Sequence, residues 1–525
     1  MRLAAALASL LAAVWLGTLG VRPLYKADES RYAEIPREMV ASGDWLTPRL
    51  NGFKYFEKPP LQYWATAAFF EAFGERDWTA RLWTALAALG GIALIYGFAN
   101  RLHGPPAGLY AAALAVASPL YVALGQFNTL DMGLTFFLSA AIFAFALGRM
   151  YLFWAACALA VLSKGLIGIV LPLGAVGVYI LAKWDWGLLR RMKLFTGGLL
   201  FLAIAAPWFI AVSRANAEFA HFFFIQEHFQ RFTSRVHDRY QPMWYFLPIL
   251  AVGAAPWLLV VFAALRRALV PRRDAAFDAP FFLAIWVLLV FAFFSVSSSK
   301  LGSYILPIFP PLAVLGGGWL AAAQPRRLLA VQGGVVALCA AVGAAVAAAA
   351  ALVPKFGGAI AAWMPWLSAG LALLAAGALA CAVLAWRGRL QPALLALAAA
   401  TFLCCQLALA GHGSLPPRFS SARLIEAAGV IPADAAVYTV DTYDHTIPWY
   451  LRRTVTMVQY RDELGQAIDW EPQKFIPDVA AFAAAWKAQR SAYAFIPLKD
   501  YDALSRDLPM AEIGRDPRFV LAKKP

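Results

Sequence analysis

About thirteen stretches of roughly 20 mostly apolar residues follow one another along the chain, and they constrain its fold more than any other feature. A helix needs about 20 such residues to cross the hydrocarbon core of a bilayer. Charged residues make up only 14% of the chain, against roughly a quarter in soluble domains. We therefore expect an all-α polytopic membrane protein, in which the short pair of runs meeting at Ser163-Lys164-Gly165 leaves the count open by one. The expected spans lie near residues 3–20, 82–99, 106–124, 130–148, 151–163, 165–182, 194–212, 243–263, 279–297, 303–323, 328–353, 361–386 and 391–412.

The net charge of +15 would suit a nucleic-acid-binding protein, but the positions of the charges argue against that class. The basic residues lie in short loops at every second membrane exit, which is the positive-inside pattern and predicts a cytoplasmic N-terminus. With thirteen spans, the C-terminus then lies outside. The first apolar run is expected to stay as an uncleaved first helix. The basic residues concerned are Arg2, Arg101, Arg149, Lys183, Arg190, Arg191, Lys193, Arg266, Arg267, Arg272, Arg273, Arg326, Arg327, Arg387 and Arg389.

Three segments break the apolar pattern, and this topology places all three on the outer side. Those near 21–80 and 213–242 mix charged and aromatic residues, as is typical of short helices that lie in the membrane interface. We expect them to be extracytoplasmic loops of a transmembrane domain over 1–415, followed by a small extracytoplasmic α/β domain over 416–525. In that domain, helix-like stretches near 479–490 and 500–508 alternate with β-like runs near 436–440, 455–459, 492–497 and 519–522.

The first outer segment begins with two adjacent carboxylates, Asp28 and Glu29, in the sequence Asp28-Glu29-Ser30-Arg31-Tyr32. Carboxylates at the membrane surface could supply a general base or hold a cation. The alternative is a helix start, because acidic residues favour helix N-termini and an apolar-periodic stretch follows. The sequence alone leaves both interpretations open.

The same segment contains Glu57 and Lys58 in an aromatic turn stiffened by Pro59 and Pro60. The ammonium group could bind a phosphate and the carboxylate a metal ion. An interfacial anchor with a snorkelling lysine explains the pattern equally well.

Asp131 opens the fourth apolar run at its outer end, where an N-cap role for Asn128, Thr129 or Asp131 is the simpler interpretation. What favours function is that many ionisable groups share this side, whereas the spans themselves are nearly free of charge. Ion-coupled transporters bury ionisable groups near the midplane, so this distribution argues against that class. The other outer-side residues are Lys164, His221, Glu227, His228, Arg231, Arg235, Lys300 and Tyr304.

Together these pieces resemble the lipid A 4-amino-4-deoxy-L-arabinose transferases, within the protein O-mannosyltransferase-like group of GT-C membrane glycosyltransferases. The resemblance covers the first three-fifths of the chain, and the first loop is its most specific part. Beyond about residue 320 only the spans match. The matching pieces are Asp28 to Ile35, Arg37-Glu38-Met39, Ser42-Gly43-Asp44-Trp45, Tyr55-Phe56-Glu57-Lys58-Pro59, Asp131, Ser163-Lys164-Gly165, Glu227 to Arg231 and Lys300 to Pro307.

The resemblance implies an enzyme that uses a sugar attached to a polyprenyl phosphate as its donor, on the periplasmic side of the bacterial inner membrane. It implies that Asp28 positions or deprotonates the acceptor, with Asp131 as a second carboxylate, and that the sugar carbon is inverted. Glu57 and His228 match positions that can hold a divalent cation, with zinc favoured, although His221 or Glu227 could replace His228. The groups expected to bind the donor phosphate are Lys58, Arg231, Lys300 and Tyr304.

The expected partners are undecaprenyl phosphate carrying 4-amino-4-deoxy-L-arabinose, lipid A as the acceptor, and the surrounding membrane lipids, with no nucleic acid and a monomeric enzyme. The same chemistry with a hexose or hexosamine, or with a protein or O-antigen acceptor, is the first alternative. A flippase or transporter for lipid-linked sugars is the second, because it would share the topology and the apolar spans.

Overall fold

The computed structural model describes residues 2–230, 241–272, 276–352, 358–415 and 418–525, which fall into two compact units. Unit 1 contains Met1–Leu19, Glu57–Gln62 and Arg81–Ser414. Unit 2 contains Gly20–Phe56, Tyr63–Ala80 and Leu415–Pro525. The second unit therefore combines most of the first loop with the C-terminal part of the chain.

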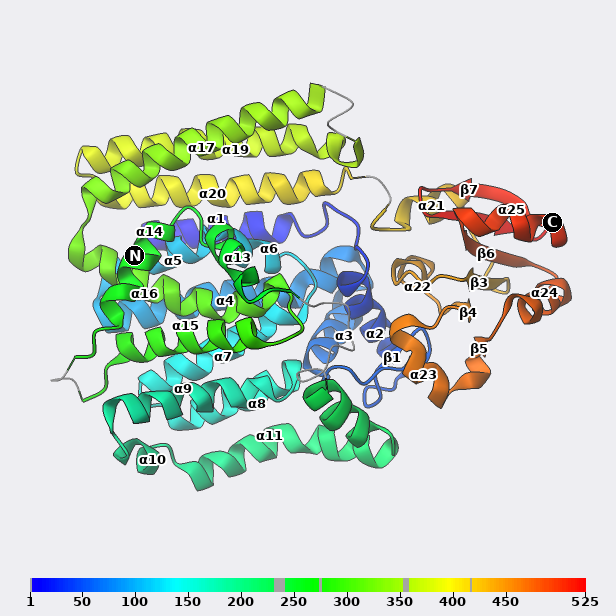
Figure 1. Ribbon diagram of the computed structural model, residues 1–525, viewed down its shortest axis with the longest axis horizontal. Helices are drawn as coiled ribbons and strands as arrows, with labels where there is room; N and C mark the ends of the chain where they lie inside the picture. Colours follow the sequence, from blue (N-terminus) through cyan, green and yellow to red (C-terminus); the bar gives the residue numbers. More distant parts are fainter. Residues whose placement is uncertain (1, 231–240, 273–275, 353–357, 416–417) are drawn as a thin grey trace. The chain divides into compact units, whose positions relative to one another are not determined.

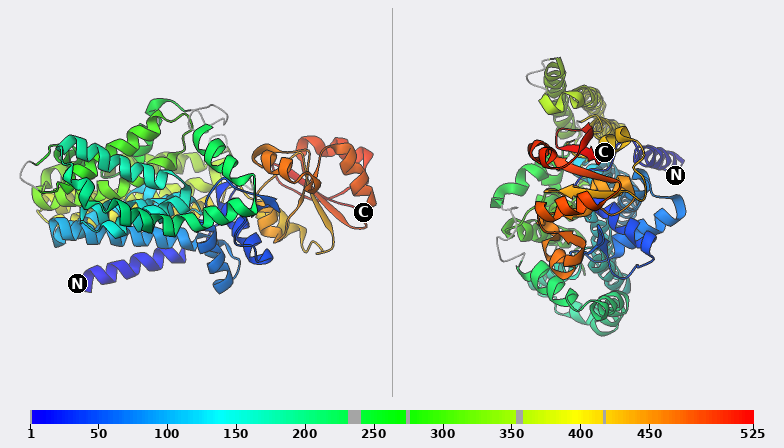
Figure 2. Two further views of the ribbon diagram at one scale, coloured as in Figure 1. Left: turned by 90° about the horizontal axis from the view of Figure 1, so that it is seen from below. Right: turned by 90° about the vertical axis from the view of Figure 1, so that its right-hand side faces the viewer.

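Unit 1 is helical, and its long helices run roughly side by side (Figures 1 and 2). Their apolar sequences favour helices that satisfy every backbone polar group internally, as a membrane requires. Its elements are α1 (Arg2–Gly17), α4 (Asp77–His103, whose first four residues belong to unit 2), α5 (Pro105–Val116), α6 (Pro119–Leu124), α7 (Leu130–Ala146), α8 (Met150–Lys164), α9 (Ile167–Lys183), α10 (Gly187–Arg191), α11 (Leu194–Ala215), the π-helix η1 (His221–Gln230), η2 (Met243–Tyr245), α13 (Phe246–Gly253), α14 (Leu258–Ala268), α15 (Ala279–Val296), η3 (Gly302–Ile308), α16 (Phe309–Ala323), α17 (Arg326–Leu352), η4 (Gly358–Trp363), α19 (Met364–Trp386) and α20 (Leu390–His412).

Every expected span falls on one helix or on successive helices, and the chain is a multi-pass membrane protein. Among the described residues, seven helices are long and apolar enough to cross a membrane by themselves. An eighth span is possible where α13 and α14 meet at an angle of 116°. The remaining expected spans correspond to shorter apolar helices, such as α5, α7, α8 and α9. The count of thirteen therefore stays a prediction.

Small residues allow close packing inside unit 1. At Gly317 of α16, an added Cβ would lie 2.6 Å from the carbonyl oxygen of Ala107 in α5. No side chain fits at that distance, so the two helices approach each other through backbone atoms. Close approach at small residues is a main source of packing energy between membrane helices.

Unit 2 contains helices in the first loop, as predicted, and a six-stranded sheet. Its elements are α2 (Asp28–Ser42), β1 (Arg49–Leu50), β2 (Phe53–Lys54), α3 (Leu61–Phe73, whose first two residues belong to unit 1), α21 (Ala422–Ala428), β3 (Ala436–Val440), α22 (Thr446–Leu451), β4 (Thr456–Val458), η5 (Asp462–Leu464), α23 (Gly465–Trp470), η6 (Pro472–Lys474), β5 (Phe475–Ile476), α24 (Val479–Ala488), β6 (Ala492–Pro497), α25 (Leu498–Asp507), β7 (Ala511–Arg515) and β8 (Phe519–Lys523).

The large sheet has the order β5-β4-β3-β6-β8-β7 and confirms the predicted α/β architecture. Strands β5, β4, β3 and β6 are parallel, whereas β8 and β7 continue the sheet antiparallel. Alternate residues of β3 enter different cores, with Tyr438 beside Trp486 of α24 on one face and Val437 beside Leu424 of α21 on the other. Helices therefore cover both faces, as parallel strands require.

Candidate active site

A cavity of about 140 Å³ in unit 1 gathers several of the residues predicted for the site. Its lining combines carboxylates, lysines and a tyrosine with the aromatic end of α15. The lining residues are Glu57, Lys58, Lys164, Ile167, Glu227, Phe293, Phe294, Ser297, Ser299 and Tyr304. Four separate parts of the chain thus place ionisable side chains around one space.

Lys58 is the central cation on one side of this cavity. Its Nζ donates to the backbone oxygen of Glu57 at 2.8 Å and to Glu227 Oε2 at 3.2 Å, and lies 3.8 Å from Glu57 Oε2. The side chains are mostly shielded from solvent, at 13% exposure for Lys58 and 8% for Glu227. One lysine therefore neutralises parts of two carboxylates in a site with little water, where such contacts are strong.

Asp131 and Lys164 form a second ion pair, between the start of α7 and the end of α8. Lys164 Nζ donates to Asp131 Oδ1 at 2.5 Å. The placement suits both helix dipoles, since an acid stabilises a helix N-terminus and a base a C-terminus. The N-cap residue of α7 is Thr129, and its side chain makes no capping bond. Asp131 is the second residue of the helix, so its carboxylate serves this ion pair and is not the N-cap.

The same lysine connects Asp131 to the cavity. Lys164 Nζ lies 4.7 Å from the centre of the Tyr304 ring, a cation–π distance. Tyr304 belongs to η3 and packs against Phe294 at the end of α15, with ring centres 5.1 Å apart. Asp131 itself does not line the cavity but holds the lysine that does.

Lys300 lies in the turn before η3 and is 4% exposed. Its Nζ donates to the backbone oxygens of Ser297 at 2.5 Å and Gln241 at 2.8 Å. Burial lowers the pKa of Lys300 below its usual range. The lysine predicted to bind phosphate thus carries bonds to two carbonyls and is not among the cavity-lining residues.

Asp28 belongs to unit 2, at the first residue of α2. Its carboxylate accepts a bond from Arg31 Nη1 at 3.0 Å, and its side chain is 44% exposed. The next acid, Glu29, is instead buried in a two-bond pair with Arg22, at 2.6 and 3.1 Å. The two adjacent carboxylates therefore have different surroundings, and Asp28 is the one that solvent or a substrate can reach.

Two of the predicted residues lie outside the described part of the structure, namely Arg231 and the side chain of His228. Among the side chains that are described, no group of three or more His, Cys, Asp or Glu residues could hold a metal ion. The predicted ligand Glu57 nevertheless faces the cavity beside Glu227, and carboxylate oxygens suit a divalent cation.

Charge balance bears on what the cavity can bind. Its described lining holds two carboxylates, Glu57 and Glu227, and two ammonium groups, Lys58 and Lys164, and the second lysine also serves Asp131. A bound phosphate would therefore bring negative charge to a site whose lysines already have partners. A divalent cation on Glu57 would offset that charge.

Two contacts at the centre of this cavity do not follow from the sequence: Lys164 has no assigned role there, and Glu227 is predicted only as an alternative metal ligand to His228. For Lys164, the sequence does offer a signal, since this lysine lies between two apolar runs. A charge at that position costs free energy in the membrane unless it has a partner, which indicates a role. Nothing near Glu227 in the sequence indicates that it binds Lys58, which is 169 residues away.

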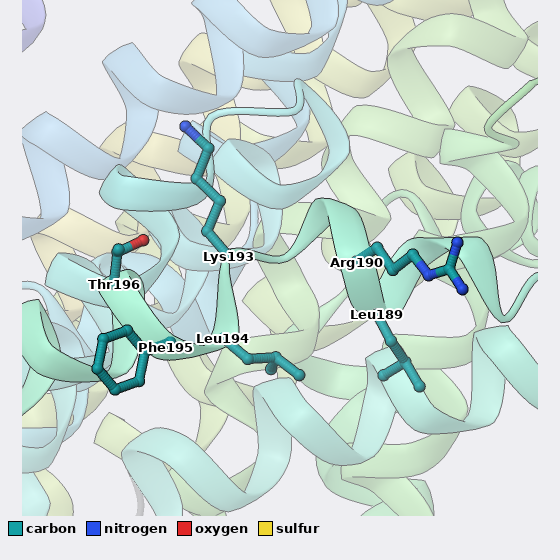
Figure 3. A pocket seen from close by; sticks show the side chains of 6 residues that line it. All are labelled: Leu189, Arg190, Lys193, Leu194, Phe195 and Thr196. Atoms are coloured by element: carbon teal, nitrogen blue, oxygen red, sulfur yellow. The ribbon is translucent and has the colours of Figure 1, made fainter.

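A larger, open cavity of about 450 Å³ lies at the start of α11, among Leu189, Arg190, Lys193, Phe195 and their neighbours (Figure 3). In the view of Figure 3 the side chains of Arg190 and Lys193 extend in different directions. The Lys193 Nζ lies 4.3 Å from the centre of the Tyr151 ring. This cavity contains none of the residues predicted for the site.

Two family models match the chain. Residues 57–210 match dolichyl-phosphate-mannose-protein mannosyltransferase, and residues 422–524 match the aminoarabinose transferase C-terminal domain. The helical membrane unit, the charged cavity and the first of these matches define the class as multi-pass membrane glycosyltransferases.

Similar proteins narrow this class to one family. A crystal structure of ArnT from Cupriavidus metallidurans bound to undecaprenyl phosphate is 36% identical, covers 98% of this chain and 96% of that chain, and superposes with a TM-score of 0.91. The ArnT structure from the same organism in the apo state is 35% identical with a TM-score of 0.90, covering 99% of this chain and 98% of that chain. The chain belongs to the aminoarabinose transferase family.

Curated relatives agree over a shorter stretch. The undecaprenyl phosphate-alpha-4-amino-4-deoxy-L-arabinose arabinosyl transferase of Edwardsiella ictaluri is 34% identical over 60% of this chain and 58% of its own length. The protein of the same name from Aeromonas hydrophila is 36% identical over 57% of each chain. These matches span less than two thirds of the curated relatives.

Proposed function

We propose that this chain transfers 4-amino-4-deoxy-L-arabinose from undecaprenyl phosphate to lipid A. The observation that carries the proposal is the unit 1 cavity, in which Lys58, Lys164 and Tyr304 surround a space beside two carboxylates. A related crystal structure that holds undecaprenyl phosphate supports the donor, and the names of the curated relatives support the sugar.

The reaction breaks the bond between the sugar carbon and the phosphate oxygen, and the electron pair leaves with the phosphate. Negative charge on the departing lipid phosphate would be stabilised by Lys58 and Lys164, with the Tyr304 hydroxyl as a further donor. Arg231 remains a proposed partner of this phosphate. Lys300 contributes either by exchanging a carbonyl partner for phosphate or by holding the turn that carries Tyr304.

Asp28 is proposed to position the acceptor or to accept its proton as the new bond to the sugar carbon forms. Its exposed carboxylate, held on one oxygen by Arg31, suits that role. A single displacement from the face opposite the phosphate inverts the sugar carbon. Asp131 acts in this proposal through Lys164, which it pairs with and orients.

A divalent cation, with zinc favoured, is proposed at Glu57 together with His228. Bound at these residues, the cation would offset the negative charge of an entering phosphate, which the lysines, already paired with carboxylates, would neutralise only in part. Glu227 is the described alternative to His228, since it faces the same cavity and carries a carboxylate.

We place the reaction on the periplasmic side of the bacterial inner membrane and propose that the enzyme acts as a monomer. The predicted positive-inside topology supports this side, since it puts every proposed site residue on the outer side of the membrane.

The test is a reaction of the purified full-length protein in lipid nanodiscs with undecaprenyl-phosphate aminoarabinose and lipid A. We expect lipid A that carries one aminopentose, detected by mass spectrometry. The variant Asp28→Asn should lose this product while unfolding at the wild-type temperature. No product from any polyprenyl-phosphate sugar would overturn the enzymatic proposal, and transfer only to a protein acceptor would overturn the lipid A assignment.

A further inference from the structure

The C-terminal domain holds the helix that begins at Asp28. Both lie in unit 2. Arg37 of α2 donates from Nη1 to the backbone oxygen of Arg452, at the end of α22, at 3.1 Å. Asn51, in the β1–β2 turn, exchanges two bonds with the backbone of Val455, at 2.9 and 2.8 Å. The first loop is therefore attached to the domain by several polar contacts.

One of these attachments continues to Asp28 itself. Arg31 Nη1 donates to Asp28 Oδ1 at 3.0 Å, and the other terminal nitrogen, Nη2, donates to Glu463 Oε2 at 2.5 Å. The second oxygen of Glu463 contacts His445 Nε2. A hydrogen-bonded series of side chains, from Asp28 through Arg31 and Glu463 to His445, thus connects the start of α2 to η5 and the N-terminus of α22.

Burial gives this hydrogen-bonded series a defined geometry. The Arg31 side chain is 6% exposed and the His445 side chain 8%, whereas Asp28 at the end is 44% exposed. A guanidinium group presents its donors in a rigid planar fork, so fixing Nη2 on Glu463 also fixes the direction of Nη1. If Glu463 were removed, the buried fork would be free to turn and pair with Asp28 through two nitrogens. That change would reorient the Asp28 carboxylate and occupy both of its oxygens.

We propose that Glu463 is a positioning residue for the acceptor carboxylate Asp28, acting through Arg31, and that His445 orients Glu463. This inference rests on the proposed role of Asp28. The C-terminal domain then contributes to the reaction, and the ion pair between Arg31 and Glu463 serves more than the attachment of the loop.

Glu471 offers a matched control. It also connects the C-terminal domain to the first loop, with Arg49 Nη1 at 3.2 Å and the backbone nitrogen of Lys54 at 2.9 Å, and it is the partner of Lys474 at 2.6 Å. Its contacts involve β1, β2 and η6 but not α2. A variant at Glu471 loses a comparable attachment without touching Arg31 or Asp28.

The experiment compares Glu463→Ala, Glu463→Gln and Glu471→Ala by steady-state transfer kinetics and by thermal unfolding. We expect Glu463→Ala to lower kcat about 10- to 100-fold with the donor KM unchanged, as for a misplaced reacting group. Glu463→Gln should recover most of kcat, because the amide oxygen can accept from Arg31 and the amide NH2 can donate to Nε2 of His445 in the tautomer that carries its proton on Nδ1. Glu471→Ala should unfold earlier than wild type but keep its kcat.

Equal kcat values for Glu463→Ala and Glu471→Ala would overturn the inference, as would a Glu463→Gln variant no more active than the alanine variant. The result for Asp28→Asn separates the two proposals. If Asp28→Asn is inactive while Glu463→Ala keeps full kcat, only the positioning role fails. If Asp28→Asn keeps full transfer, the proposed role of Asp28 fails first.

Discussion

Glu38, a buried carboxyl on α2, should make the stability of unit 2 depend on pH. Burial, and after it the negative charge of Glu34, raise the pKa of Glu38 to about 8 against the opposing effect of Arg37. The side chain is 7% exposed, and Oε2 accepts a bond from the backbone nitrogen of Gly52 at 2.8 Å. At neutral pH the folded protein therefore keeps Glu38 protonated.

The direction of the effect follows from proton binding. Between pH 4.5 and pH 8, Glu38 is ionised in the unfolded chain but protonated in the folded one, so the folded state binds more protons. The contribution of Glu38 to stability is complete below pH 4.5 and is lost as the pH rises through about 8. At about 1.4 kcal/mol per pH unit, the loss is at most about 5 kcal/mol, and water entry would reduce it.

The variant Glu38→Gln tests this reasoning, because the amide is neutral at every pH and its oxygen can still accept from Gly52. We expect the variant and the wild type to unfold at similar temperatures at pH 5, and the variant to be more stable at pH 8.5. The assay is thermal unfolding of the full chain in nanodiscs across this range. A difference between the two proteins that is the same at both pH values would refute the assignment of a raised pKa.

Glu471→Gln is the control. The contacts of Glu471 with Lys474, Lys54 and Arg49 lower its pKa despite burial, so it is ionised in folded and unfolded protein throughout this range. The substitution should change stability by the same amount at pH 5 and pH 8.5.

Three further predictions concern the cavity and the Asp131–Lys164 ion pair beside it. Lys58→Met should lower kcat/KM for the donor about 10- to 150-fold, as expected for the loss of a charged hydrogen bond of about 1.5–3 kcal/mol, whereas the exposed Lys499→Met should have no effect in the same transfer assay. Asp131→Asn should destabilise the protein by about 3 kcal/mol or more in denaturation measurements, because the buried Lys164 loses this carboxylate, and adding Lys164→Met should recover part of that loss; a single variant as stable as wild type would contradict the buried pair. Glu57→Ala should reduce the zinc bound per protein, measured by elemental analysis, and a chelator should slow wild-type transfer; full activity after chelation would contradict the metal proposal.

Much of the fold could be predicted because apolar length and alternation are local signals. Strands β3 and β6 follow their predicted ranges, and α24 and α25 lie within two residues of theirs at each end. Strands β5 and β7 do not follow from the sequence. The first has only two residues, and the second is largely exposed, so neither shows the buried β-branched run on which the prediction relied.

The pairing of site residues could not be predicted, because it depends on tertiary packing and not on local sequence. Lys164 and Asp131 are 33 residues apart, and Arg31 and Glu463 are 432 residues apart. The expected amphipathic helix after α11 is also different in kind. It is a π-helix over His221–Gln230. The hydrophobic pattern of this segment does not distinguish the wider turns of a π-helix from those of an α-helix.

The most direct test of the central claim is lipid A mass spectrometry from cells with and without this protein, supplied with the same polyprenyl-phosphate donor. We predict lipid A that carries an added aminopentose only when the protein is present, and loss of that species when the Asp28→Asn variant replaces the wild type. Identical lipid A spectra in the presence and absence of the protein would contradict this prediction.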